Sequence, residues 1–187
     1  MVDLGSLWLP VVLSATLVFL ASFLAWVVLP HHRKDFAPLP DEEGVLADLR
    51  SRALAPGMYS FPYATTGEEA RGESFKARVK AGPVGFLLVQ RPEQKLSMGS
   101  ALLQVFVFYL VVGVFVAYIG YVTLEPGTDY RTVFRVTGTA AFMAHCGALF
   151  PRSIWFGFSW KTTWKETADG LVYALLTAGA FGWLWPG

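Results

Sequence analysis

The chain has 187 residues, of which 54% are hydrophobic and only 16% are charged, and its formal net charge is +1. A soluble domain carries about 25% charged residues, so this chain has too few charges to cover the surface of a soluble globule. The composition excludes a disordered chain, and the single cysteine excludes a disulfide scaffold. The small net charge and the lack of a basic block argue against nucleic-acid binding. The sequence therefore predicts an integral membrane protein.

Four apolar stretches are candidates for membrane-spanning helices, because a helix needs roughly 20 apolar residues to cross the hydrocarbon. Residues 7–29 and 100–124 contain no charged residue. Residues 132–150 include Arg135 and His145, and residues 167–185 include Asp169 near their start. We expect an all-α membrane fold, a bundle of four transmembrane helices.

The first stretch is predicted to be a retained anchor rather than a cleaved signal peptide. No Lys or Arg precedes it, and its apolar run is longer than the about 7–15 residues usual for a signal peptide. Basic residues follow it instead, at Arg33 and Lys34.

Basic residues predict the orientation, because cytoplasmic loops are richer in Lys and Arg than the loops on the other side. Residues 31–99 hold ten Lys or Arg residues and residues 151–166 hold three, whereas the opposite side holds only Arg131. We therefore expect residues 30–99 to form a cytoplasmic insertion and both termini to lie outside the cytoplasm.

The insertion, residues 30–99, is predicted to be a small α+β unit. Residues 41–54 and 68–80 have helical patterns, residues 58–63 an extended pattern, and residues 84–90 the pattern of a buried strand. The sequence leaves open whether the two extended segments pair in parallel, as a strand–helix–strand unit, or form a two-strand ribbon. Such a small unit buries little core alone, so we expect it to lean on a neighbouring segment or on a partner.

Residues 151–166 are aromatic and apolar but too short to cross, and they predict an interfacial segment on the cytoplasmic leaflet.

Small residues recur every four positions in the last predicted span, at Gly170, Ala174, Ala178 and Gly182. This spacing places them on one helix face, where backbones can approach closely. The favoured interpretation is packing inside the bundle. The alternative is a groove that receives a helix from another protein or from a second copy.

Arg135 lies about one turn inside the third predicted span, where its long side chain can extend to the headgroups. The alternatives are an interhelical pair or a bound anionic lipid on the outer side.

All three histidines, His31, His32 and His145, fall near the cytoplasmic side of this topology. Together with Cys146 and Asp169 they are candidate groups for binding a transition metal or relaying a proton. None of them has the helical i, i+3 or i, i+4 spacing of a metal motif. The simpler interpretation places His31 and His32 in a basic flank and makes His145 a hydrogen-bond partner of Asp169 or Tyr173.

Several short motifs together resemble an uncharacterised family of small bacterial integral membrane proteins with four spans. They are His31-His32-Arg33, Leu39-Pro40-Asp41-Glu42-Glu43, Ala55-Pro56-Gly57-Met58-Tyr59 with Phe61-Pro62, Gly82-Pro83-Val84-Gly85, and the ending from Asp169 to Gly179. The resemblance implies a four-span architecture in a bacterial inner membrane. It implies no activity and no catalytic residues.

The expected role is non-enzymatic: an accessory, scaffold or assembly subunit of a membrane complex. No catalytic constellation, phosphate-binding loop or cofactor motif is present, so we expect no nucleotide and no cofactor. The expected partners are membrane lipids, with another integral membrane protein or a second copy as an alternative. The alternative function is a small oligomeric transporter, or a metal- or proton-handling membrane protein that uses the histidines and Asp169.

The predicted topology can be tested with reporter fusions. A reporter fused after Gly187 is expected to face outside, and one inserted near Gly72 is expected to face the cytoplasm, because of the Lys and Arg distribution. Activity of periplasm-specific and cytoplasm-specific reporters measures both positions. A C-terminal fusion that is active only in the cytoplasm contradicts the four-span topology.

Overall fold

The structure, a computed structural model, describes residues 2–93 and 97–187. The chain divides into two compact units, which are described separately: unit 1 is Met1–Phe36 with Gly99–Gly187, and unit 2 is Ala37–Met98. Lys95, one of the basic residues counted for the topology, lies outside the described residues.

Unit 1 begins with a nearly continuous apolar helical run. The 3-10 helix η1 (Leu4–Leu7) leads into α1 (Trp8–Phe23), which continues as a π-helical turn, η2 (Leu24–Val28). Asp3 caps the start by accepting a hydrogen bond from the Ser6 N–H at 3.1 Å. Pro10 fits in the first turn of α1, where a missing N–H breaks no helical hydrogen bond.

The remaining helices of unit 1 are α6 (Met98–Thr123), α7 (Tyr130–Cys146), α8 (Leu149–Phe156) and α9 (Trp160–Trp183). Asp129 caps α7 by accepting hydrogen bonds from the N–H groups of Arg131 and Thr132. The hydrogen bonds from Thr132 hold the pKa of the Asp129 carboxyl below its usual value. This cap starts α7 sharply after the short connection from α6.

Within residues 2–93 and 97–187, three helical runs are long and apolar enough to cross a membrane: Leu4–Val28, Met98–Thr123 and Tyr130–Phe156. These helices are those of a membrane protein. The 24-residue helix α9 is not among them, because charged residues fill its N-terminal part. The four-span count expected from the sequence is therefore not confirmed.

The bounds of the last helices differ from the sequence prediction. The helical run expected to end at Phe150 continues as α8 to Phe156, and α9 begins at Trp160 rather than at residue 167. The separate segment expected at residues 151–166 is thus divided between two helices. Gly157 makes the turn between them, with a φ of +69° that side chains rarely tolerate.

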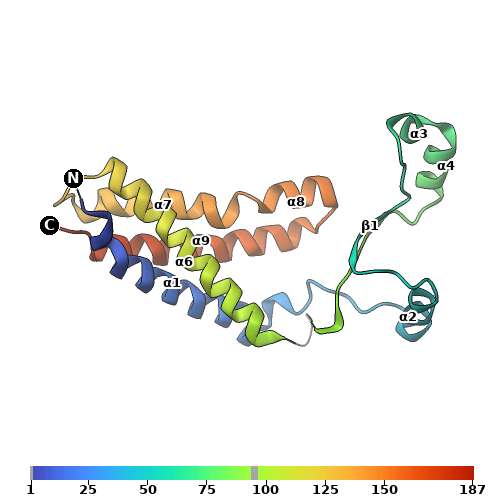
Figure 1. Cartoon of the computed structure of the whole chain (residues 1–187), viewed down its shortest axis with the longest axis horizontal. Coiled ribbons are helices and arrows are strands. Elements are labelled where there is room, and N and C mark those ends of the chain that lie inside the picture. Colours follow the sequence, from blue (N-terminus) through green and yellow to red (C-terminus); the bar gives the residue numbers. More distant parts are fainter. Residues whose placement is uncertain (1, 94–96) are drawn as a thin grey trace. The chain divides into compact units, whose positions relative to one another are not determined.

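The helices α7 and α9 lie side by side, and α6 crosses them (Figure 1). Small residues permit this approach: a Cβ added at Gly138 of α7 would lie 3.0 Å from the Ala178 Cβ of α9. Gly170 similarly faces Cys146, and Gly182 faces the ring of Tyr130. The small-residue face of α9 therefore packs against α7 within the bundle.

The two chain termini lie at the same end of unit 1 (Figure 1). One core cluster joins Val2 and Leu7 from the start of the chain to Phe181 near its end, and it also includes Leu124 just after α6. The Trp185 indole N–H donates to the Glu125 carbonyl oxygen at 3.0 Å, and the Gly127 N–H donates to the Pro186 carbonyl at 2.8 Å. These contacts fix the C-terminal segment to the α6–α7 connection.

Unit 2 contains α2 (Glu42–Ser51), β1 (Gly57–Phe61), α3 (Gly67–Arg71), α4 (Glu73–Ala81) and β2 (Gly85–Val89). The two strands pair antiparallel with Met58 opposite Leu88, so the ribbon is the alternative that the structure adopts. The helix expected at residues 68–80 is two helices divided at Gly72. The expectation of a buried strand at residues 84–90 is wrong, because Phe86 and Leu88 are 51% and 60% exposed.

Among its described residues, unit 2 has no fully buried side chain. Local contacts organise it instead, including the Arg78–Glu69 ion pair at 2.9 Å and the Tyr59 hydroxyl, which donates to the Ala55 carbonyl at 2.7 Å. Such exposed pairs contribute little stability.

The packing between α7 and α9 gives a stability prediction. Ala178→Leu is expected to lower the free energy of unfolding by about 2 kcal/mol, because Ala178 is fully buried and the added atoms would collide with Gly138. Val172→Leu is the matched control, because Val172 on the same helix is 48% exposed. Unfolding in mixed detergent micelles measures both variants. Equal stability of the two variants contradicts this packing.

Candidate functional site

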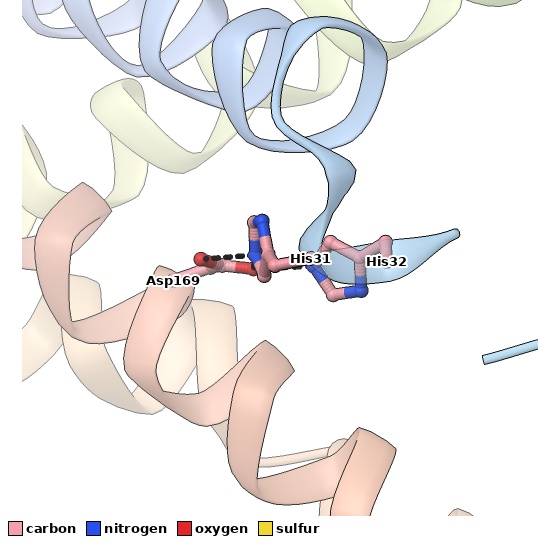
Figure 2. A group of neighbouring side chains, drawn as sticks. All are labelled: His31, His32 and Asp169. Atoms are coloured by element: carbon pink, nitrogen blue, oxygen red, sulfur yellow. Dashed lines mark hydrogen bonds and ion pairs between the residues drawn. The ribbon is translucent and has the colours of Figure 1, made fainter. Parts of the chain in front are cut away.

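Three potential metal ligands meet at the end of unit 1 opposite the termini: His31, His32 and Asp169. One ligand atom from each lies within 4.8 Å of the others. The histidines come from the short 3-10 helix η3 (Pro30–His32), and Asp169 comes from α9. Figure 2 shows both histidines reaching from the segment after α1 toward α9.

The local backbone explains why the histidines face α9. The π-helical turn η2 ends at an extended residue, Leu29, and Pro30 then starts η3 with the fixed φ that suits a first helical position. The chain therefore leaves the axis of α1 immediately before His31. Turns of the π type within helices are often found at functional sites.

His32 is the central side chain of the group, and it is only 4% exposed. Its Nε2 lies 2.7 Å from Asp169 Oδ2, and its Nδ1 lies 2.6 Å from Asp35 Oδ2. An ionised carboxylate only accepts hydrogen bonds, so a ring N–H of His32 donates to the carboxylate that it faces. His31 is held more loosely, with its Nε2 3.4 Å from the Asp169 carboxylate.

Lys165 completes the group from α9. Its Nζ forms an ion pair with Asp35 Oδ1 and donates to the His31 carbonyl oxygen at 2.6 Å. Burial raises the pKa of the Asp35 carboxyl, but the hydrogen bonds from Lys165 and His32 outweigh burial and hold that pKa below its usual value. We call Asp35, His32, Lys165 and Asp169 the charged clasp. It joins the segment after α1 to the first half of α9.

Trp26 covers one face of the clasp. Its indole stacks on the His32 ring, with centroids 3.8 Å apart and an angle of 3° between the planes. This stacking fixes the orientation of the imidazole and of its two nitrogens.

The donor set fits a divalent transition-metal ion. Two imidazoles and one carboxylate are ligands typical of Zn²⁺ and related first-row ions, and ligand bonds of about 2.0–2.2 Å place neighbouring ligand atoms roughly 3.3 Å apart. The 3.4 Å between His31 Nε2 and Asp169 already matches this spacing. The 2.7 Å between His32 Nε2 and Asp169 must widen by about 0.6 Å, and an ion there replaces the shared proton.

Asp35 has the position of a supporting residue for such an ion. A metal-binding histidine usually donates its second ring N–H to a carboxylate, which fixes the tautomer and the ring orientation. The Nδ1 of His32 makes this contact with Asp35 and leaves Nε2 directed at Asp169 and His31.

His145, predicted as a third metal-binding histidine, is not part of this group. Its ring lies edge-on to those of Tyr109 and Tyr173, at centroid distances of 5.9 and 5.6 Å. Its Nε2 is buried without a hydrogen-bond partner among the described residues, so it does not make the expected bond to Asp169 or Tyr173. His145 packs instead against Gly170 of α9, where an added Cβ would lie 3.5 Å from the His145 Cβ.

A pocket of about 200 Å³ lies between His145 and the clasp. Its lining combines aromatic rings with ionisable groups, among them Trp26, Tyr109, His145, Arg152, Glu166 and Asp169. Arg152 pairs with Glu166 at 2.6 Å, so a second ion pair links α8 to α9 beside the clasp. Asp169 borders both the pocket and the candidate metal site.

Of the other predicted site residues, Gly170 lines this pocket, whereas Gly182 lies against the ring of Tyr130. Ala174 and Ala178 are buried against α7. Arg135 is exposed on α7 and has no ion pair among residues 2–93 and 97–187.

Asp35 and Lys165 are functional candidates that the sequence reasoning missed. Asp35 is three residues after His32, and a carboxylate close to a histidine pair could have marked it as a partner. The sequence predicts Lys165 as part of the interfacial segment, residues 151–166. Only the fold brings it to Asp35, which is 130 residues away.

Taken together, the fold and this end of the bundle define a helical protein with membrane-length apolar segments and a buried charged group at one end. Comparisons of the chain with protein-family models, with curated proteins and with solved structures found no match.

The charged clasp gives a stability prediction. Lys165→Met is expected to lower the free energy of unfolding by about 2–3 kcal/mol, because Asp35, whose side chain is 3% exposed, keeps its charge and loses a cationic partner. Lys161→Met on the same helix is the control, since Lys161 is exposed. Unfolding in mixed micelles measures both. A Lys165→Met protein as stable as Lys161→Met contradicts the clasp.

Proposed function

We propose that the protein is a four-span integral membrane protein that binds a divalent transition-metal ion at the end of its bundle formed by His31, His32 and Asp169. The observation that carries this proposal is the convergence of three ligand atoms within 4.8 Å of one another. The Asp35 carboxylate on His32 Nδ1 supports it, because it supplies the second contact that a metal-binding histidine needs.

The fourth span belongs to this proposal. At 1.5 Å per residue the 24 residues of α9 extend about 36 Å, which exceeds the roughly 30 Å of hydrocarbon. Its charged residues Lys165, Glu166 and Asp169 each have a partner of opposite charge, which lowers the cost of placing them near the membrane. The common end of the two termini also favours an even number of spans.

We further propose that the metal site faces the cytoplasm of a bacterial cell and that the protein lies in the inner membrane. The Lys and Arg distribution supports this orientation. The metal site is then at the cytoplasmic surface, where it can take up or release an ion.

Metal binding replaces the accessory or scaffold role as our first proposal. The scaffold interpretation depended in part on a groove of small residues open to a partner, and that face of α9 contacts α7. The proposed role remains non-enzymatic, since ion binding needs only the three ligands and their supporting carboxylate. The aromatic pocket beside Asp169 favours handling of the ion over a purely structural site, because structural sites are usually closed.

Metal content tests the proposal. The whole protein, purified in mild detergent and exposed to Zn²⁺, Mn²⁺ or Ca²⁺ alone, is expected to retain about one equivalent of a transition metal and no Ca²⁺. His31→Gln is expected to lower the affinity by at least about 10–100-fold, the cost of losing even a supporting contact. His31 is the better test residue, because its 3.4 Å contact contributes less to the clasp than His32 does.

His145→Gln is the matched control, and it is expected to keep the metal, because His145 lies outside the ligand group. Mass spectrometry of the metal content and isothermal titration measure these variants. If the wild-type protein binds none of the ions, or if His31→Gln binds as tightly as His145→Gln, the cluster is a structural clasp alone and the metal proposal is wrong.

A further inference from the structure

A second site is indicated by an apolar groove of about 280 Å³ between α7 and α9, separate from the charged clasp. The close approach of Gly138 to Ala178 brings the two helices together. Larger side chains on either side then form the walls, with Phe134 and Phe142 on α7 and Leu171 and Leu175 on α9. The groove therefore forms because the helices pack tightly where Gly138 approaches Ala178.

Arg135 is the only charged residue in the lining of this groove. It is exposed, and the described parts of the chain contain no ion pair to its guanidinium. Arg135 lies five residues after Tyr130, which is about 7.5 Å along the helix axis at 1.5 Å per residue. A charged side chain at such a depth is costly unless an anion or polar groups accompany it.

The groove runs from Arg135 toward the middle of the helical run Tyr130–Phe156, which is apolar enough to cross a membrane. Phe142 lies seven residues beyond Arg135, about 10 Å further along the axis. The site thus has a cationic end and an apolar length. It matches a molecule with an anionic head and a hydrocarbon tail.

We propose that the α7–α9 groove binds one acyl chain of an anionic phospholipid whose headgroup phosphate pairs with Arg135. The inference depends on α7 crossing the membrane, but not on the metal site. A guanidinium makes two parallel hydrogen bonds to phosphate oxygens, which suits a headgroup fixed above the groove. A helix from a partner is about 10 Å wide with its side chains, which is too bulky for a groove of about 280 Å³.

Native mass spectrometry of the intact protein with added phosphatidylglycerol or phosphatidylcholine tests this site. One phosphatidylglycerol is expected to remain bound under conditions that remove phosphatidylcholine. Arg135→Gln is expected to weaken phosphatidylglycerol binding about tenfold or more, because a charge-assisted pair is lost. Arg131→Gln, four residues earlier on the same helix, is the control, and it is expected to bind like the wild-type protein.

Leu175→Trp tests the apolar part of the groove without changing the charge. The larger side chain is expected to occupy the groove and to reduce phosphatidylglycerol retention while the protein stays folded, because Leu175 is 48% exposed. Arg135→Lys provides a second variant if Arg135→Gln does not fold. It keeps the charge and is expected to retain part of the binding.

Three results overturn the inference: equal retention of both lipids, unchanged binding in Arg135→Gln and Leu175→Trp, or displacement of phosphatidylglycerol by inorganic phosphate at similar concentration. The last result means that Arg135 binds an anion and the groove binds no chain. Metal content measured in the same variants is expected to stay at the wild-type level, which separates this site from the proposed metal function.

Discussion

An ionised side chain near hydrocarbon is stable only with a partner, and that constraint determines how unit 1 is assembled. The helix α9 carries Lys165, Glu166 and Asp169 within five residues, immediately before its apolar part. No two of these residues neutralise each other. Their partners are Asp35, Arg152 and His32, which come from the segment after α1 and from α8. The first half of α9 is therefore stabilised only when both of those elements are in place, and the charged clasp couples the two ends of the sequence.

The two ends of the bundle are held by different forces. Close to the termini, Val2, Leu7 and Phe181 belong to one buried cluster, and dispersion contacts between small and apolar groups hold the helices together. At the other end, directional hydrogen bonds and ion pairs around His32 hold the helices together. The apolar packing near the termini is hard to rearrange. The polar network around His32 can exchange a proton for a cation. A ligand-responsive site is thus more compatible with the charged end.

Sequence patterns within short stretches of the chain predicted the helices and strands that form from local interactions. The apolar runs located three membrane-length helices, and the turn residues located both strands of unit 2 within two residues. The antiparallel pairing, and the continuation of the third helix to Phe156, depend on contacts that no local pattern encodes. The candidate site also depends on contacts between residues far apart in the sequence. The sequence makes His31, His32 and Asp169 candidates for one metal site, but no local spacing links them across 137 residues, and His145 joins the candidates only because it falls on the same side of the predicted topology.

The clasp and the proposed metal site use the same atoms, so they cannot both be complete at one time. His32 Nε2 and Asp169 Oδ2 are joined by a hydrogen bond of 2.7 Å. A cation held here would be bound by His31, His32 and Asp169, and its bonds to His32 and Asp169 would take the place of that hydrogen bond. The segment after α1 then remains tied to α9 through the ion, while Asp35 and Lys165 keep their contact on the far side of His32. Binding is therefore a substitution within an existing link. For the His32–Asp169 pair it would require the separation of 2.7 Å to widen by about 0.6 Å, and Asp169 also lines the adjacent pocket.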